Sequence, residues 1–103
     1  MKYSIPERVL KDIIRFAKYH DIERVILFGS RARGDHAERS DIDLAVSGVD
    51  FDGFYWDIKE NTHSLLMFDL VDLNRQISEE LREEIQREGI VIYEKAKHPG
   101  AYL

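Results

Sequence analysis

The chain has 103 residues, a length at which we expect one small domain over residues 1–103 and no separate substrate-binding domain. It combines 44% apolar and 34% charged residues and has no cysteine, so it fits a folded domain without disulfide or thiolate chemistry. The formal net charge of −5 argues against a nucleic-acid template, because non-specific binding to nucleic acid depends on cationic contacts with phosphates.

Two further features set the expected location. No stretch of the sequence approaches the roughly 18 continuous apolar residues of a membrane span. The first residues, from Met1 to Glu7, lack the apolar core of a signal peptide. We therefore expect no membrane partner and a cytoplasmic location.

Local signals predict secondary structure along the whole chain. Ser4-Ile5-Pro6-Glu7 is typical of a helix start, with Ser4 as N-cap and Glu7 completing a capping box, and the helix runs to about Tyr19. Apolar residues recur on one stripe of this helix. The predicted elements that follow are a strand over 23–28, a short helix over 31–36, a strand over 42–47, a helix over 54–63, a strand over 66–73, a helix over 79–88 with Ser78 as N-cap and Gly89 as its stop, a strand over 90–93, and a tail from about 95 to 103.

The alternation of these helices and strands predicts the fold class. Helices that alternate with strands are typical of an α/β or α+β domain. We expect a mixed β-sheet of about four strands, with the helices packed mainly on one face.

One motif joins a tight turn to a pair of carboxylates. Gly29-Ser30 follows the first predicted strand, and Asp41-Ile42-Asp43 opens the next strand after ten intervening residues. A turn between a strand and a helix presents free N–H groups that suit a phosphate. Carboxylates at i and i+2 of a strand project from the same face and suit a divalent cation with hard oxygen ligands. The motif therefore indicates a metal-nucleotide site.

This motif resembles the signature of the polymerase-beta-type nucleotidyltransferase superfamily. The segment from Gly29 to Gly34, followed by Ser40-Asp41-Ile42-Asp43-Leu44, is similar in residues and spacing to the minimal nucleotidyltransferases, and the similarity extends over nearly the whole chain. Prokaryotic members of this branch often act as antitoxins beside a HEPN-domain toxin. The resemblance implies the mixed-sheet nucleotidyltransferase fold, ATP as substrate and magnesium as cofactor.

A third acidic residue is expected on the strand over 66–73. Carboxylates hold the two cations of such sites about 3.5 to 4 Å apart. The superfamily has its third acid between apolar residues on a strand, so the resemblance points to Asp69, with Asp72 as the alternative. Strand alternation puts Asp69 and Asp72 on opposite faces unless a bulge intervenes, so we expect only one of them at the metals.

These residues have the following expected roles. Asp41 and Asp43 coordinate magnesium, and Asp69 holds the catalytic cation next to the acceptor hydroxyl. Gly29 admits the triphosphate close to the backbone, and Ser30 donates hydrogen bonds to it. Arg31 or Arg33 neutralises charge on the pyrophosphate leaving group.

Three functions fit these features. In the first, the protein moves AMP from ATP onto a hydroxyl of a HEPN toxin and so acts as its antitoxin. The resemblance implies that this hydroxyl belongs to a tyrosine. In the second, the protein masks the toxin by binding alone within a hetero-oligomer. In the third, it is the catalytic subunit of a two-chain nucleotidyltransferase that modifies an antibiotic or another small molecule.

Overall fold

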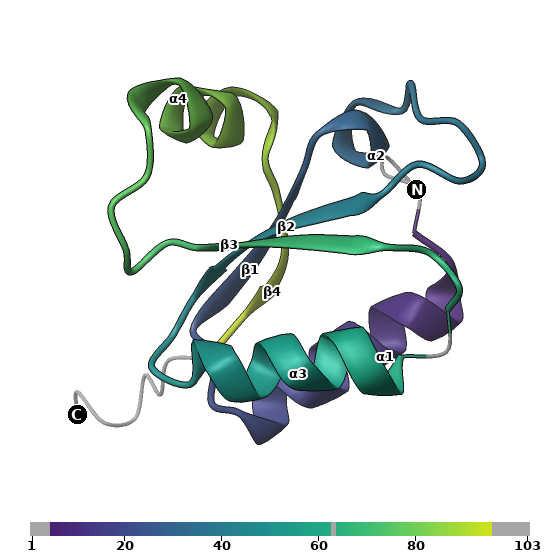
Figure 1. The fold of residues 1–103 in the computed structure, drawn as a ribbon, viewed down its shortest axis with the longest axis vertical. Helices are drawn as coiled ribbons and strands as arrows, with labels where there is room; N and C mark the ends of the chain where they lie inside the picture. Colours follow the sequence, from purple (N-terminus) through teal and green to yellow (C-terminus); the bar gives the residue numbers. More distant parts are fainter. Residues whose placement is uncertain (1–4, 63, 96–103) are drawn as a thin grey trace, which may run out of the picture.

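Within residues 5–62 and 64–95, which the computed structural model describes, the chain forms a four-stranded mixed β-sheet with the order β3-β2-β1-β4 (Figure 1). The strands are β1 (Arg24–Phe28), β2 (Ile42–Ser47), β3 (Phe68–Asp72) and β4 (Ile90–Glu94). β1 runs antiparallel to both of its neighbours, whereas β2 and β3 are parallel. The helices are α1 (Glu7–Tyr19), α2 (Ser30–Arg33), α3 (Phe51–Asn61) and α4 (Glu79–Glu88). The predicted α/β fold with a mixed sheet is thus confirmed.

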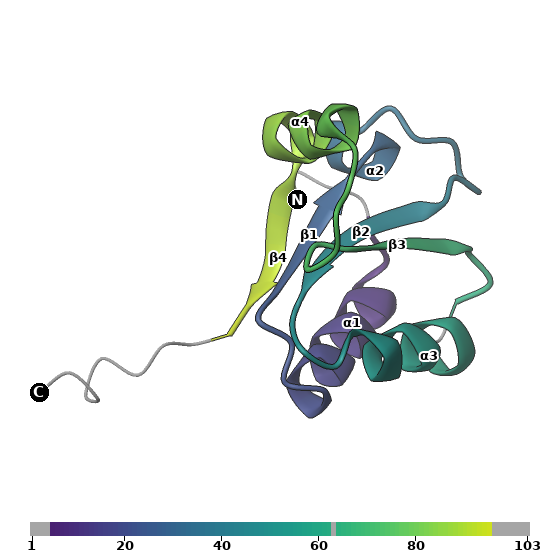
Figure 2. The same cartoon turned by 60° about the vertical axis from the view of Figure 1, so that its left-hand side comes forward.

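Two of the helices cover one face of the sheet. α1 and α3 lie side by side beneath the strands in both views (Figures 1 and 2). They bury Ile13, Phe54 and Ile58 against strand residues such as Leu27 and Leu44, all of which are inaccessible to solvent. Burial of each such side chain contributes about 1.5 to 3 kcal/mol. This layer is the main hydrophobic core.

α4 lies over the opposite face of the sheet. Ile85 of α4 forms a second cluster with Phe28 and Ala45, which alternate along their strands with residues of the main core. Figure 2 shows α4 beyond the strands, away from α1 and α3. The helices are therefore concentrated on one face, as expected, but one long helix covers part of the other.

Several predicted boundaries differ from the structure. α3 begins three residues earlier than expected, because the Asp50 carboxylate caps it by accepting a hydrogen bond from the Gly53 N–H. α2 is shorter, because Gly34 ends it in the left-handed region at φ 88°. α1 begins at Glu7 with Pro6 at the N-cap position. Ser4, the predicted helix end at His63 and the tail over 96–103 lie outside the described residues.

Other boundaries agree closely with the sequence. β2 and α4 have the predicted limits, and the Ser78 hydroxyl accepts a hydrogen bond from the Leu81 N–H as an N-cap. β3 begins two residues later than predicted. No helix in the described part of the chain is long and apolar enough to cross a membrane.

A histidine bridge joins the two helices of the main core. His20, directly after α1, has its Nδ1 2.7 Å from Asp50 Oδ2 and its Nε2 2.6 Å from Asp57 Oδ2. Burial lowers the pKa of His20, but the hydrogen bonds and negative charges of Asp57 and Asp50 outweigh it, so the net pKa is raised. The hydrogen bonds from His20 lower the pKa of both aspartates. The bridge is therefore strongest when the imidazole is charged and both carboxylates are ionised.

The bridge predicts a pH-dependent contribution to stability. The raised pKa of His20 gives stability that is complete below the ordinary value of 6.5 and is lost as the pH rises through the folded-state pKa. The lowered pKa values of Asp50 and Asp57 give stability that is present above 3.8 and is lost as the pH falls further. We expect His20→Asn to lower the free energy of unfolding by about 1 to 2 kcal/mol near pH 5 and by less at pH 8.5.

Urea denaturation of both proteins at the two pH values measures this difference. Arg24→Gln is the control, because it removes an exposed ion pair with Glu94 that contains no histidine. An equal loss of stability from His20→Asn at both pH values would contradict the prediction.

Candidate active site

Three aspartates share one face at one end of the sheet. Asp43 is the second residue of β2 and lies directly opposite Asp69 of β3 in the parallel register. Asp41 precedes Asp43 by two residues, so its side chain projects on the same side. Asp41 and Asp69 are exposed and Asp43 is half-buried. The structure therefore brings Asp43 and Asp69 onto paired positions of neighbouring strands, with Asp41 directly before β2.

The electrostatics of Asp43 shows that these acids are close. Burial of the carboxyl, followed by the negative charges of Asp69, Asp41 and Glu84, raises the pKa of Asp43 to about 6. The positive charge of Arg33 lowers it slightly. Negative charge is thus concentrated around one carboxylate, an environment that favours a bound cation.

The glycine-serine turn lies against the same carboxylate. Gly29 follows β1 with φ 76°, a backbone conformation that residues with a side chain rarely adopt. A Cβ atom at Gly29 would collide with Oδ2 of Asp43, because Phe28 and Asp43 are paired across the two antiparallel strands. Ser30 begins α2 and is half-buried at this turn. The two halves of the motif therefore meet in space.

Arg31 points into the protein. Its side chain is only 3% exposed, and its guanidinium donates from Nε to the Ser40 carbonyl and from Nη2 to the Glu38 carbonyl, both at 3.0 Å. These donors are used by the loop between α2 and β2. This arrangement does not favour the predicted contact between Arg31 and a nucleotide.

Arg33 lies on the outside of the same short helix. Its Nε donates to Asp35 Oδ2 at 3.0 Å, and its Nη1 donates to Glu88 Oε1 of α4 at 2.9 Å. Its positive charge acts on Asp43. Of the two arginines, Arg33 is therefore the one whose charge borders the cluster of acids from an exposed position.

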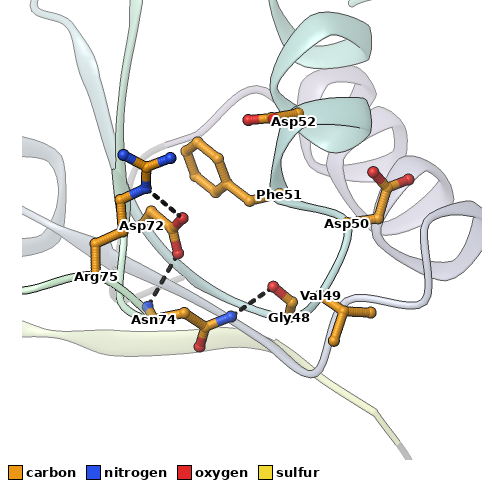
Figure 3. A pocket seen from close by; sticks show the side chains of 8 residues that line it. All are labelled: Gly48, Val49, Asp50, Phe51, Asp52, Asp72, Asn74 and Arg75. Atoms are coloured by element: carbon orange, nitrogen blue, oxygen red, sulfur yellow. Dashed lines mark hydrogen bonds and ion pairs between the residues drawn. The ribbon is translucent and has the colours of Figure 1, made fainter.

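Asp72, the alternative third acid, lies at the other end of β3. It is opposite Val46 in the register, three positions beyond the pair of Asp43 and Asp69. Its carboxylate accepts a hydrogen bond from the Asn74 N–H at 2.9 Å and forms an ion pair with Arg75 at 3.5 Å (Figure 3). In the same view, the side chain of Asn74 donates to the Gly48 carbonyl, which fixes this turn. The register thus favours Asp69 over Asp72 as the third acid.

The sequence did not predict the contribution of α4. The run from Glu79 to Glu88 has the pattern of an exposed helix face, yet the charge of Glu84 raises the pKa of Asp43 and Glu88 pairs with Arg33. The i, i+4 spacing of Glu84 and Glu88 places them on one side of the helix. Without the position of α4 over the sheet, that spacing does not identify what the two acids face.

Three carboxylates make up the possible ligands for a metal ion at this site. Carboxylate oxygens are the ligands that Mg²⁺ prefers, and Asp41, Asp43 and Asp69 supply them on one face. Among residues 5–62 and 64–95, however, no three histidine or acidic side chains are arranged so that they could hold a metal ion as they stand. The residue types and their proximity fit a divalent cation, and the side-chain positions are not those of a closed cage.

Comparison with known proteins identifies the family. Residues 11–98 match the family model described as "Polymerase beta, Nucleotidyltransferase". The chain is 35% identical over 100 residues to a Methanocaldococcus jannaschii protein named "Putative protein adenylyltransferase MJ0604", covering 84% of this chain and 97% of the relative.

Solved structures of similar proteins agree with this result. A crystal structure of a toxin-antitoxin with AMP-PNP has a TM-score of 0.64 and 26% identity, covering 84% of this chain and 73% of the other. A crystal structure of a mutant of the toxin-antitoxin MntA-HpeT has a TM-score of 0.63 and 25% identity, covering 89% and 75%. The chain therefore belongs to the polymerase beta nucleotidyltransferase family, as a minimal member that resembles MntA.

Proposed function

We propose that this protein is a magnesium-dependent adenylyltransferase that moves AMP from ATP onto a hydroxyl group of a partner toxin, and that it thereby acts as the antitoxin. We further propose that the toxin has a HEPN domain, that the acceptor is a tyrosine, and that the reaction takes place in the cytoplasm. The single observation that carries the proposal is the contact between the Gly29 turn and the Asp43 carboxylate, with Asp69 paired beside Asp43.

The choice of nucleotide and partner is supported by similarity. The Methanocaldococcus jannaschii relative bears the name of a protein adenylyltransferase, and two similar structures are toxin-antitoxin assemblies, one of them with AMP-PNP. The HEPN domain and the tyrosine are taken from the resemblance of the motif to the minimal nucleotidyltransferases. A hetero-oligomer of toxin and antitoxin would present the acceptor hydroxyl to the acids.

The reaction would use the residues of this face in distinct roles. Asp41, Asp43 and Asp69 would hold the cations. We propose two cations, by analogy with two-metal sites. Bound magnesium supplies charge that offsets the triphosphate and lowers the pKa of the acceptor hydroxyl. Gly29 lets the Asp43 carboxylate pack against the backbone of the turn, and the Ser30 hydroxyl at the start of α2 would donate a hydrogen bond to the triphosphate. Arg33 adds positive charge at the edge of the acids.

The chemistry balances as a displacement at phosphorus. The acceptor oxygen forms a bond to the α-phosphorus of ATP, and the bond from that phosphorus to the bridging oxygen breaks to release pyrophosphate. The hydroxyl proton must leave as the new bond forms. Asp69, exposed on the edge strand β3, would accept it.

Replacing the acids tests the function directly. We expect Asp41→Asn and Asp43→Asn each to lower transfer of AMP to the co-expressed partner by roughly 100-fold or more, because each removes a charge that the reaction needs. Asp72→Asn is the matched control on the same sheet, and we expect it to retain transfer. Mass spectrometry of the partner measures the modification, and survival of cells that express the toxin measures neutralisation.

The outcomes separate the candidate functions. Loss of both transfer and neutralisation in the Asp41 and Asp43 variants supports catalysis. Neutralisation that persists without transfer identifies a masking antitoxin. An unmodified partner in the presence of the wild-type protein, ATP and magnesium contradicts the proposal, and modification of a small molecule in its place would identify the catalytic subunit of a small-molecule enzyme.

A pair of glycine variants tests the contact that carries the proposal. Gly29→Ala introduces a Cβ at φ 76° against Asp43, whereas Gly34→Ala introduces one at φ 88° into open space. Both variants add backbone strain: about 1 to 2 kcal/mol for Gly34, which is in the αL region, and more for Gly29, whose ψ of −157° lies in a region that essentially only glycine adopts. We expect transfer to fall by about 100-fold in Gly29→Ala only, because displacing a catalytic group by ~1 Å has an effect of this size.

Urea denaturation and the rate of transfer measure the two effects separately. Equal losses of transfer in the two glycine variants, at equal losses of stability, would show that the contact with Asp43 is not needed.

A further inference from the structure

A buried arginine lies next to the proposed site without belonging to the set of acids. The Arg31 side chain is 3% exposed, and burial of a charged group is costly unless its donors find acceptors. Its Nε and Nη2 donate to the carbonyl oxygens of Ser40 and Glu38, each at 3.0 Å. Both acceptors are backbone atoms of the loop between α2 and β2. The arginine therefore fixes the path of the main chain.

This loop leads directly into Asp41. Its last turn is closed by two hydrogen bonds, from the Ala37 N–H to the Ser40 hydroxyl at 2.8 Å and from the Ser40 N–H to the Ala37 carbonyl at 3.1 Å. On the other side of Asp41, the Ile42 N–H donates to the Met67 carbonyl at 2.9 Å and joins the chain to β3. Asp41 thus lies between a residue held by Arg31 and a residue held by the sheet.

The side chain of Asp41 has little support of its own. It is exposed, and it makes no hydrogen bond or ion pair within the described part of the chain. Its position beside Asp43 therefore depends on its backbone. The carbonyl of the preceding residue, Ser40, is the atom that Arg31 holds.

We propose that Arg31 is a positioning residue for Asp41: its two hydrogen bonds to the loop set the backbone of Asp41 so that its carboxylate stands next to Asp43. Because Arg31 comes two residues after Gly29, it also links the glycine-serine turn to the acids. The inference rests on the proposed function for its effect on catalysis. This role differs from the contact with pyrophosphate that the sequence predicts, because in that contact the same N–H donors of Arg31 would bind the ligand.

The geometry of the guanidinium is essential to this role. Arginine presents several N–H donors in a planar fork, so it can bind two carbonyls in fixed directions. A lysine carries its donors on a single flexible ammonium and cannot reproduce the fork. Arg31→Lys therefore keeps the charge and removes the geometry. Arg31→Ala removes both.

The experiment compares Arg31→Lys and Arg31→Ala with the wild type, and uses Arg24→Ala as the matched control. Arg24 is an exposed arginine of β1 that pairs with Glu94, away from the acids. Hydrogen exchange of residues 35–43 reports the order of the loop without any need for activity. The transfer assay gives the half-saturating magnesium concentration, the KM for ATP at saturating magnesium, and kcat. Thermal unfolding shows which proteins are folded at the assay temperature.

We expect faster exchange over residues 35–43 in both Arg31 variants and not in Arg24→Ala. We expect the half-saturating magnesium concentration to rise by about 10- to 100-fold, the usual effect of removing a residue that orients a metal ligand, with little change in the KM for ATP. Guanidinium ion, added to Arg31→Ala well below denaturing concentrations, should bring the half-saturating magnesium concentration part of the way back to the wild-type value, and tetramethylammonium at the same concentration should not.

Three results would overturn the inference. A rise in the KM for ATP with an unchanged magnesium dependence would show that Arg31 contacts the nucleotide. Unchanged exchange over residues 35–43 in folded Arg31→Lys would show that the loop does not depend on it. Full activity in Arg31→Lys would show that the fork is not needed. If the wild-type protein transfers no AMP, the proposed function fails, and the exchange measurement still decides whether Arg31 orders the loop.

Discussion

The close packing of Gly29 against the Asp43 carboxylate is the constraint on which the site depends. Antiparallel pairing of β1 with β2 sets Phe28 opposite Asp43, so the next residue along β1 must pass directly by that carboxylate. A residue without a side chain, in the left-handed region, is what this passage requires. The half-buried carboxylate of Asp43 is thereby placed next to both Asp69 and the Gly29 turn. Its raised pKa, caused by burial and then by Asp69 and Asp41, shows that the packing concentrates negative charge.

The rest of the fold stabilises this unfavourable concentration of charge. One face of the sheet is fixed by the core between the strands and the helices α1 and α3, where residues such as Ile13 and Phe54 are fully buried. On the opposite face, Ile85 of α4 packs on Phe28 and Ala45. Phe28 directly precedes Gly29, and Ala45 follows Asp43 by two residues along β2, on the same face of the sheet. Asp43 and Asp69 are therefore mounted on strands held from both faces. Rigid elements of this kind keep like charges close together where flexible loops would let them separate.

The sequence predicted those parts of the molecule that depend on local signals. α4 has its predicted limits because Ser78 is a local N-cap, and β2 does because its apolar residues are bounded by polar ones. The register of β2 and β3 is a long-range property, so the sequence left Asp69 and Asp72 as alternatives, and the pairing of Asp43 with Asp69 favours the first. The bridge from His20 to Asp50 and Asp57 and the proximity of Glu84 to Asp43 depend on how helices are placed on the sheet. No spacing within a single helix contains that information.

The two arginines of α2 show how much follows from helical geometry once one contact is known. Residues at i and i+2 of a helix are about 200° apart around its axis, so Arg31 and Arg33 must point to nearly opposite sides. Because Arg31 is buried against the loop before Asp41, Arg33 is directed outward to Asp35 and to Glu88 of α4. The short helix that begins with Ser30 is thus tied to the loop before Asp41 on one side and to α4 on the other. A shift of the glycine-serine turn would strain both connections, so the turn and the carboxylates keep a fixed relation.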